Sequence, residues 1–243
     1  MSPVIAIFGA GTGLGASVAH RFGREGFTVA LVGRRPERLE ALRAELQGDG
    51  IPSETFVADL ADPDSIRGLV RDIETRLGDI DVVEYGPVSA DLAFTAARDL
   101  DAAALAAFVP LFLLSPVELV SAVLPKMLER GRGSILLTQG SFAVAPLPFA
   151  SGPGPVMAAT RNYVHSLHGE LAGTGVFAGT LAIGASIDRS EMSVRAAATG
   201  DQPDDGGRGR VDPDDLAEEY WQMHVRQDVV EVVRPDPSVA VLS

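Results

Sequence analysis

The chain has 243 residues, of which 46% are hydrophobic, so it is long enough to bury one substantial core. It contains no cysteine, which excludes disulfides and thiolate metal sites. Its formal net charge of −13 argues against a nucleic-acid partner or an anionic membrane surface, because both require clustered cations.

The N-terminal residues MSPVIAIFGAG contain no basic segment, and their apolar run is too short for a signal peptide or a membrane span. We therefore expect a cytoplasmic protein. Apolar runs then alternate with amphipathic stretches along the chain. The apolar runs predict strands at 4–8, 28–33, 51–58, 80–86, 134–140 and 175–184. The amphipathic stretches predict helices at 14–26, 36–46, 62–78, 101–130 (kinked near Pro110 and Pro116), 156–172 and 213–227.

This alternation predicts a parallel sheet with helices on both faces. We expect an α/β protein with a Rossmann-like, doubly wound fold, in which residues 1–243 form a single domain. Ligands on such sheets bind beyond the carboxyl ends of the strands. Residues 186–212 follow a predicted strand and are rich in Gly, Asp and Pro, with little periodicity. This segment is therefore predicted to be a mobile substrate loop.

The turn after the first strand reads GAGTGLG and leads into a predicted helix. Glycines allow the backbone to approach a pyrophosphate, and the helix N-terminus offers free N–H groups and the positive end of its dipole. A tight turn that needs a positive φ is the alternative reading, but four glycines in seven residues exceed what one turn needs. The turn therefore predicts dinucleotide binding through Gly9, Gly11, Gly13 and Gly15.

The second predicted strand ends in Gly33, Arg34 and Arg35, with no acidic residue. A carboxylate at this position would accept a hydrogen bond from the ribose 2′-hydroxyl of NAD, whereas arginine pairs with the 2′-phosphate of NADP. The sequence thus favours NADP(H) over NAD as the cofactor. Alternatively, both arginines are solvated charges at the start of a helix.

Five stretches together carry a family resemblance: GAGTGLG, LVGRRPERLEAL, ADL at 58–60, VLPKM at the end of a long helix, and AIG at 182–184. They resemble the short-chain dehydrogenase/reductase superfamily over about residues 4–190. The resemblance implies that Asp59 and Leu60 flank the adenine ring, and that the backbone after Gly184 meets the nicotinamide carboxamide. It also implies that Thr12 and Leu14 line the pyrophosphate together with the glycines.

The family's usual assembly is a homodimer or homotetramer that forms through two long helices. The alanine- and leucine-rich stretch 102–124 fits such an interface, although the same composition fits a core helix. We accordingly expect a homo-oligomer that acts on a small molecule and has no nucleic-acid or membrane partner.

The family's chemistry relies on a Tyr-x-x-x-Lys pair, in which the tyrosine transfers a proton and the lysine lowers its pKa. Counting back from HGEL at 168–171 places the tyrosine at Pro153 and the lysine at Met157. The only lysine in the chain is Lys126, on another predicted helix, and no Tyr-x-x-x-Lys occurs anywhere. The standard mechanism is therefore absent from this sequence.

Other expected positions have changed as well. The family's serine falls on Gly140, its asparagine on Phe112, and a threonine of the first turn on Phe8. Its Asn-Asn-Ala-Gly stretch, which lies beside the cofactor, falls on residues 85–88, so we place Tyr85 and Gly86 in the cofactor site.

Two residues are candidate substitutes for the missing proton donor, and the catalytic residues are otherwise unassigned. Ser141 adjoins the expected serine position, and Tyr85, preceded by Glu84, is predicted to face the cofactor cleft at a strand end. Tyr163 lies nearly three helical turns from Pro153 and is expected to pack at a helix interface. His165 and His168 are expected to be structural, and four scattered histidines offer no metal site.

The leading hypothesis is an NADP(H)-dependent oxidoreductase that acts on an unknown small molecule with a non-standard proton donor. A second hypothesis is a non-redox protein that senses NADP(H). A third is a non-redox biosynthetic enzyme, such as a cyclase or isomerase, that uses the same pocket. The fold alone does not decide among them.

Overall fold

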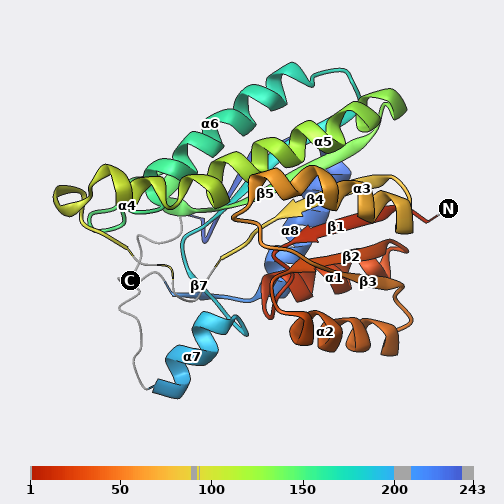
Figure 1. Cartoon of the computed structure of the whole chain (residues 1–243), viewed down its shortest axis with the longest axis horizontal. Coiled ribbons are helices and arrows are strands. Elements are labelled where there is room, and N and C mark those ends of the chain that lie inside the picture. The colour runs from red at the N-terminus through yellow and green to blue at the C-terminus, as the bar shows by residue number, and fades with distance from the viewer. Residues whose placement is uncertain (1, 89–91, 93, 200–208, 237–243) are drawn as a thin grey trace.

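The computed structural model describes residues 2–88, 92, 94–199 and 209–236. Its centre is a seven-stranded sheet in the order β3-β2-β1-β4-β5-β6-β9, in which every neighbouring pair is parallel (Figure 1). The strands are β1 (Val4–Phe8), β2 (Thr28–Gly33), β3 (Ser53–Val57), β4 (Ile80–Tyr85), β5 (Gly133–Gly140), β6 (Val176–Ile183) and β9 (Glu231–Arg234). The predicted α/β, doubly wound fold is confirmed.

Two layers of helices cover the sheet, one on each face (Figure 1). One face packs against α1 (Leu14–Arg24), α2 (Pro36–Gly48) and α8 (Pro213–Arg226). The other face packs against α3 (Ile66–Leu77), α5 (Ser115–Arg130) and α6 (Gly154–Glu170). The central strands are buried on both faces, which is why they are continuous apolar runs in the sequence.

The long helix expected at 101–130 is irregular at its N-terminal end. A short helix, α4 (Ala102–Ala106), is followed by a π-helical turn at Pro110–Leu114 and then by α5. Pro110 has no N–H to donate, which accounts for the break in the hydrogen-bonding pattern at the expected position. Pro116 lies in the first turn of α5, where a missing N–H is tolerated.

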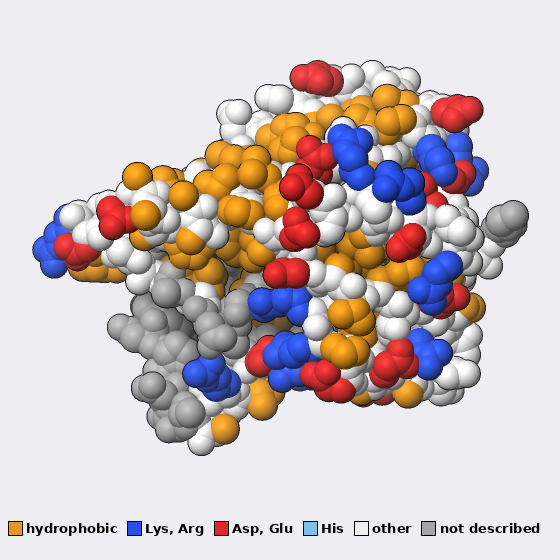
Figure 2. Space-filling view, viewed as in Figure 1, with side chains coloured by type: hydrophobic (Ala, Val, Ile, Leu, Met, Phe, Trp, Pro, Cys, Tyr) orange, Lys and Arg blue, Asp and Glu red, His pale blue; other side chains and the backbone are white. Residues whose placement is uncertain are grey.

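The whole stretch Ala102–Arg130 is, by length and composition, apolar enough to cross a membrane. Its most apolar 18-residue window has a mean hydropathy of 2.0, and 28% of that window is buried. Core helices of soluble proteins pass the same test, so this is weak evidence for a span. Figure 2 shows hydrophobic side chains gathered on the surface over α4 and α5.

The structure differs from the predicted elements toward the C-terminus. The four-residue strand β9 pairs with β6 at the sheet edge, and its brevity and flanking charges hide it in the sequence. Within 186–212, where no regular structure was expected, β7 (Ser186–Ile187) pairs with β8 (Arg210–Val211), and α7 (Glu191–Thr199) forms between them. Residues 200–208 of the predicted loop lie outside the described residues.

Candidate active site

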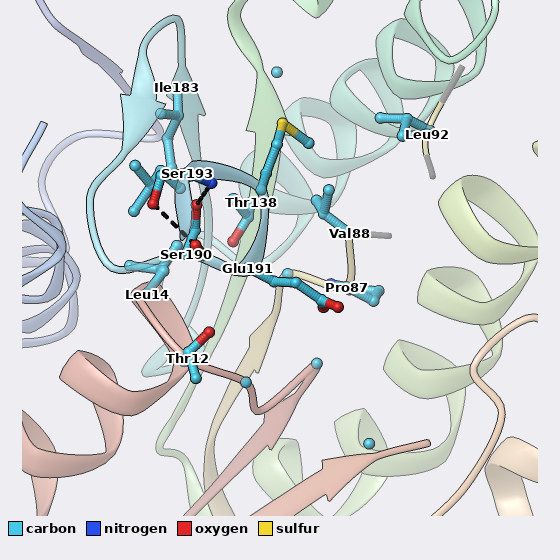
Figure 3. Close-up of a pocket in the computed structure, with 18 of the residues that line it drawn as sticks. Thr12, Leu14, Pro87, Val88, Leu92, Thr138, Ile183, Ser190, Glu191 and Ser193 are labelled. Carbon is cyan, nitrogen blue, oxygen red and sulfur yellow. Dashed lines mark hydrogen bonds between the residues drawn. The ribbon is translucent and has the colours of Figure 1, made fainter. Parts of the chain in front are cut away.

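A cavity of about 560 Å³ opens at the carboxyl ends of the parallel strands, where the fold predicts a ligand (Figure 3). Its walls come from the turn after β1, the ends of β2, β4, β5 and β6, and the first turns of α7. One end is lined by arginines and Asp59. The other end is largely apolar and is lined by Val88, Leu92, Phe94, Phe142, Met157 and Met192.

The glycine-rich turn needs its glycines for close backbone contacts. Gly9 has φ +110°, and a Cβ there would lie 2.7 Å from the Pro87 backbone. A Cβ on Gly15 would lie 3.0 Å from Ala10 Cα. Gly13 has φ +83° and precedes α1, whose N-terminus has no side-chain cap. The turn therefore brings uncapped backbone N–H groups to the cavity, as phosphate binding requires.

Most residues predicted to hold the cofactor line this one cavity. They are Gly9, Gly11, Thr12, Leu14, Gly15, Arg34, Arg35, Asp59, Leu60, Gly86 and Gly184. Gly13 is not part of the cavity wall. Ser190 lies directly against it, since a Cβ on Gly13 would be 3.0 Å from the Ser190 Cα. The structure thus brings the predicted set together, while their role in binding stays a prediction.

The predicted positions of the missing catalytic groups form an apolar cluster. Met157 is buried in α6, and its sulfur accepts a hydrogen bond from the Gly140 N–H at 3.4 Å. Phe112 packs in the same cluster as Met157, together with Val156 and Ala143. Pro153 immediately precedes α6. Of the four positions, Met157 and Gly140 line the cavity, so a thioether and a glycine stand there where the resemblance implies an ammonium group and a hydroxyl.

The comparisons with known proteins agree with this geometry. The family described as short chain dehydrogenase matches residues 3–198. This chain belongs to that family. A relative, the sulfoacetaldehyde reductase of Chromohalobacter salexigens, is 30% identical over 185 residues, which cover 76% of this chain and 72% of the relative.

Solved structures of the same fold superpose closely on this short-chain dehydrogenase. The L-sorbose reductase from Gluconobacter frateurii, complexed with NADPH and L-sorbose, has a TM-score of 0.83 at 19% identity, covering 96% of this chain and 94% of that one. The NADPH-bound short chain oxidoreductase from Pseudomonas aeruginosa PAO1, which contains an atypical catalytic center, has a TM-score of 0.81 at 20% identity, covering 96% of each chain. At these identities the likeness shows the fold.

The prediction that Tyr85 faces the cofactor cleft is wrong. Tyr85 is 3% exposed and lies in the core between the sheet and α5, and its hydroxyl donates a hydrogen bond to the Leu111 carbonyl at 2.6 Å. Burial raises the pKa of Tyr85 above its ordinary value. Since the alternating pleat directs Tyr85 to the same face as Val83, it neither lines the cofactor site nor donates a proton there.

The other polar side chains considered from the sequence also lie outside the cavity wall. Ser141 packs against Gly184, where a Cβ would lie 2.7 Å from its hydroxyl oxygen. Tyr163 packs against the core, as expected. His165 pairs with Glu231 at 3.2 Å, and His168 lies 2.9 Å from the Ala178 carbonyl oxygen.

A buried acid beside a residue of the cavity wall was missed as a site residue. Glu84, at 2% exposure, accepts a hydrogen bond from the Thr138 hydroxyl at 2.7 Å, and that hydroxyl lies 2.6 Å from the Tyr220 hydroxyl on α8. Burial raises the pKa of Glu84 to about 8, against the opposing effect of the Thr138 hydrogen bond. Thr138 and its neighbour Gln139 line the cavity. Of the two acids in the strand sequence IDVVEYG, Glu84, which directly follows two valines, was the signal for this group.

A second acid was missed because α7 was not predicted. The Glu191 carboxylate receives hydrogen bonds from both terminal nitrogens of Arg35, at 2.7 and 2.5 Å. It also lies 3.0 Å from a terminal nitrogen of Arg38, and all three residues line the cavity. The hydrogen bonds from Arg35, followed by those from Arg38, lower the pKa of Glu191 to about 2.

Proposed function

We propose that this protein is an NADP(H)-dependent reductase of a small, largely apolar carbonyl compound. The observation that carries the proposal is a single cavity with a glycine-rich, arginine-bearing end and an apolar end. When bound, NADP(H) supplies the hydride, and the family's relatives include reductases named for carbonyl substrates.

The cofactor end fits a dinucleotide phosphate in two respects. The backbone at Gly9 and Gly15 packs so closely against its neighbours that a side chain would have no room at either position. Because these residues are glycines, no side chain blocks the approach of a pyrophosphate to the turn. Arg35 and Arg38 lie together on the cavity wall at the start of α2, where guanidinium groups can pair with a 2′-phosphate. We therefore assign NADP(H), rather than NAD(H), as the cofactor.

The other end of the cavity supports an apolar substrate. Phe94 and Phe142 pack edge to face, and Met157, Val88 and Leu92 complete that wall. Among the described residues, this wall offers a charged substrate no ionic partner to compensate for its lost hydration. The segment 186–192, which leads into α7, also contributes to the cavity lining and is proposed to enclose the substrate.

The proton for the reduced oxygen is assigned to the pair formed by Thr138 and Glu84. As the carbonyl carbon is reduced, the Thr138 hydroxyl turns from Glu84 toward the substrate and gives its proton to the substrate oxygen, and Thr138 Oγ1 then recovers a proton from neutral Glu84. The carboxyl is thereby left as carboxylate, to be reprotonated from water. The distance of 2.7 Å between Thr138 Oγ1 and Glu84 Oε1 supports the transfer between them.

The proposal is tested in two stages, binding first and turnover second. NADPH binding is measured by fluorescence titration, and NADPH consumption is then followed with a panel of apolar aldehydes, ketones and enones. We expect binding and consumption with at least one carbonyl. Binding without turnover across the panel would contradict the reductase and favour a sensor of NADP(H), whereas no binding would favour a non-redox enzyme.

A Glu84→Gln variant tests the proton source separately. We expect unchanged NADPH affinity, a rate lowered by roughly 100-fold, and loss of the fall in rate that the wild type shows above a pH of about 8. An unchanged pH profile in this variant would remove Glu84 from the mechanism while leaving the reductase proposal intact.

A further inference from the structure

Glu191 occupies an unusual position in the cavity, because its carboxylate pairs with the very arginines that suit a cofactor phosphate. Both terminal nitrogens of Arg35 donate to it, and Arg38 lies within 3.2 Å of its oxygens. Figure 3 shows the Glu191 side chain extending from the first turn of α7 into the cavity. Two arginines from the start of α2 thus converge on one acid contributed from more than 150 residues along the chain.

A carboxylate and a phosphate monoester offer the same recognition features to arginine. Each presents two oxygens that accept parallel N–H donors in a planar, bidentate arrangement. The Glu191 carboxylate therefore satisfies the same donors that a ribose 2′-phosphate would use. One guanidinium cannot make its full bidentate contact with both anions along the same edge.

The backbone that carries Glu191 is also placed against the phosphate-binding turn. A Cβ on Gly13 would lie 3.0 Å from Ser190 Cα and 3.1 Å from Ser190 N, so the N-terminal end of α7 rests on this turn. The Ser193 N–H and hydroxyl bond to the Ser190 hydroxyl and carbonyl, at 3.1 and 2.9 Å, which fixes the start of the helix. Glu191 is thereby held over the cavity rather than projecting from a free loop.

We propose that Glu191 determines cofactor affinity and selectivity by occupying the 2′-phosphate position until NADP(H) displaces it. The proposal rests on the proposed NADP(H) function. The incoming 2′-phosphate takes over the Arg35 and Arg38 donors, and Glu191 turns away toward solvent. A cofactor without this phosphate leaves the ion pairs in place and gains no contact with the two arginines.

Displacing Glu191 from the two arginines costs free energy, which lowers the affinity for a 2′-phosphate. NAD(H) carries a ribose hydroxyl at this position and leaves the ion pairs in place, so its affinity is not lowered in this way. Removing the Glu191 charge should therefore strengthen binding of ligands that carry a 2′-phosphate and leave other adenosine ligands nearly unchanged. The ion pairs are partly exposed, with 45% of the Arg35 and 32% of the Glu191 side chain accessible, so solvent screening keeps the effect moderate.

The test compares wild type with Glu191→Gln by calorimetric titration of two small probes, adenosine 2′,5′-bisphosphate and adenosine 5′-monophosphate. We expect Glu191→Gln to bind the bisphosphate roughly three- to tenfold more tightly and the monophosphate within about twofold of wild type. The control is Glu218→Gln, which removes the same charge from an ion pair with Arg21 outside the cavity wall. It should change neither affinity by more than about twofold.

The outcomes separate this inference from the proposed function. Unchanged or weaker bisphosphate binding by Glu191→Gln, with wild type still binding it, would overturn the exchange and leave NADP(H) binding intact. Equal strengthening by Glu218→Gln would also overturn it, since the effect would then be one of net charge. A wild type that binds neither probe nor NADPH would instead refute the proposed cofactor and this inference together.

Discussion

At the scale of single residues, Glu84 is a group whose charge state near neutral pH depends strongly on the fold. The cause is its burial, which raises its pKa from an ordinary 4.5 to about 8. The folded protein then holds a proton that the unfolded chain releases at a pH of about 4.5. Stability from this group is full below that pH and is lost as the pH rises toward about 8.

This linkage predicts that wild type loses roughly 1.4 kcal/mol of unfolding free energy for each pH unit between about 5 and 8, relative to Glu84→Gln. The measurement is urea denaturation of both proteins across that range. Glu45→Gln, which removes a carboxyl from the exposed face of α2, serves as the control. Parallel curves for wild type and Glu84→Gln would show that Glu84 is already ionised in the folded protein.

Gly86 is predicted to be intolerant of a side chain, because a Cβ there would lie 2.5 Å from both Glu84 Oε1 and Thr138 Oγ1. Gly86→Ala should separate this hydrogen-bonded pair and lower stability by roughly 1–3 kcal/mol. Gly48→Ala is the matched control, since its Cβ would meet nothing within 4 Å at the end of α2. Equal stability of the two variants in thermal melts would contradict the contact.

At the scale of elements, the sequence predicts the helices and strands whose hydrophobic pattern is long enough to recognise, and it misses the short ones. The central strands are apolar because both faces of the sheet are covered, and that pattern is visible without a structure. β9 has four residues and α7 has nine, so neither offers enough periods to stand out beside glycine- and proline-rich neighbours. Glu191 was missed along with its helix.

The error at Tyr85 arises at the same scale and has a physical cause. A strand's side chains alternate, so Val82 and Glu84 share one face of β4, while Val83 and Tyr85 share the other. A position at the carboxyl end of a strand does not by itself give a side chain access to the cleft. The pleat instead sends Tyr85 into the core and leaves Glu84 on the face where Thr138 and Tyr220 meet it.

The glycine-rich turn yields an element-scale prediction. Gly9→Ala combines an unfavourable φ of +110° with a 2.7 Å approach to the Pro87 backbone, so it should shift the turn away from the cavity. We expect NADPH affinity to fall by at least roughly tenfold while the far-ultraviolet circular dichroism stays near that of wild type. Undiminished affinity in Gly9→Ala would remove the turn from the binding site.

At the scale of the whole molecule, the apolar surface over α4 and α5 requires an explanation. Leu114, which immediately precedes α5, is 45% exposed, and Leu128, in α5, is 42% exposed. We propose that a second copy of the chain covers it, which matches the helix-mediated assembly that the family resemblance implies.

Light scattering during size-exclusion chromatography tests this assembly. Wild type should elute as a dimer or tetramer, and the double variant Leu114→Glu/Leu128→Glu should elute as a monomer. Val225→Glu, at an exposed position on α8, should leave the assembly unchanged. A monomeric wild type would contradict the proposal.

We propose that this chain keeps the family's cofactor end, although no Tyr-x-x-x-Lys occurs in its sequence. Parallel fluorescence titrations with NADPH and NADH test that claim most directly. We expect saturable NADPH binding, at least roughly tenfold tighter than NADH binding, with most of this preference lost in Arg35→Ala. Equal or tighter binding of NADH, or no binding of either nucleotide, would contradict it.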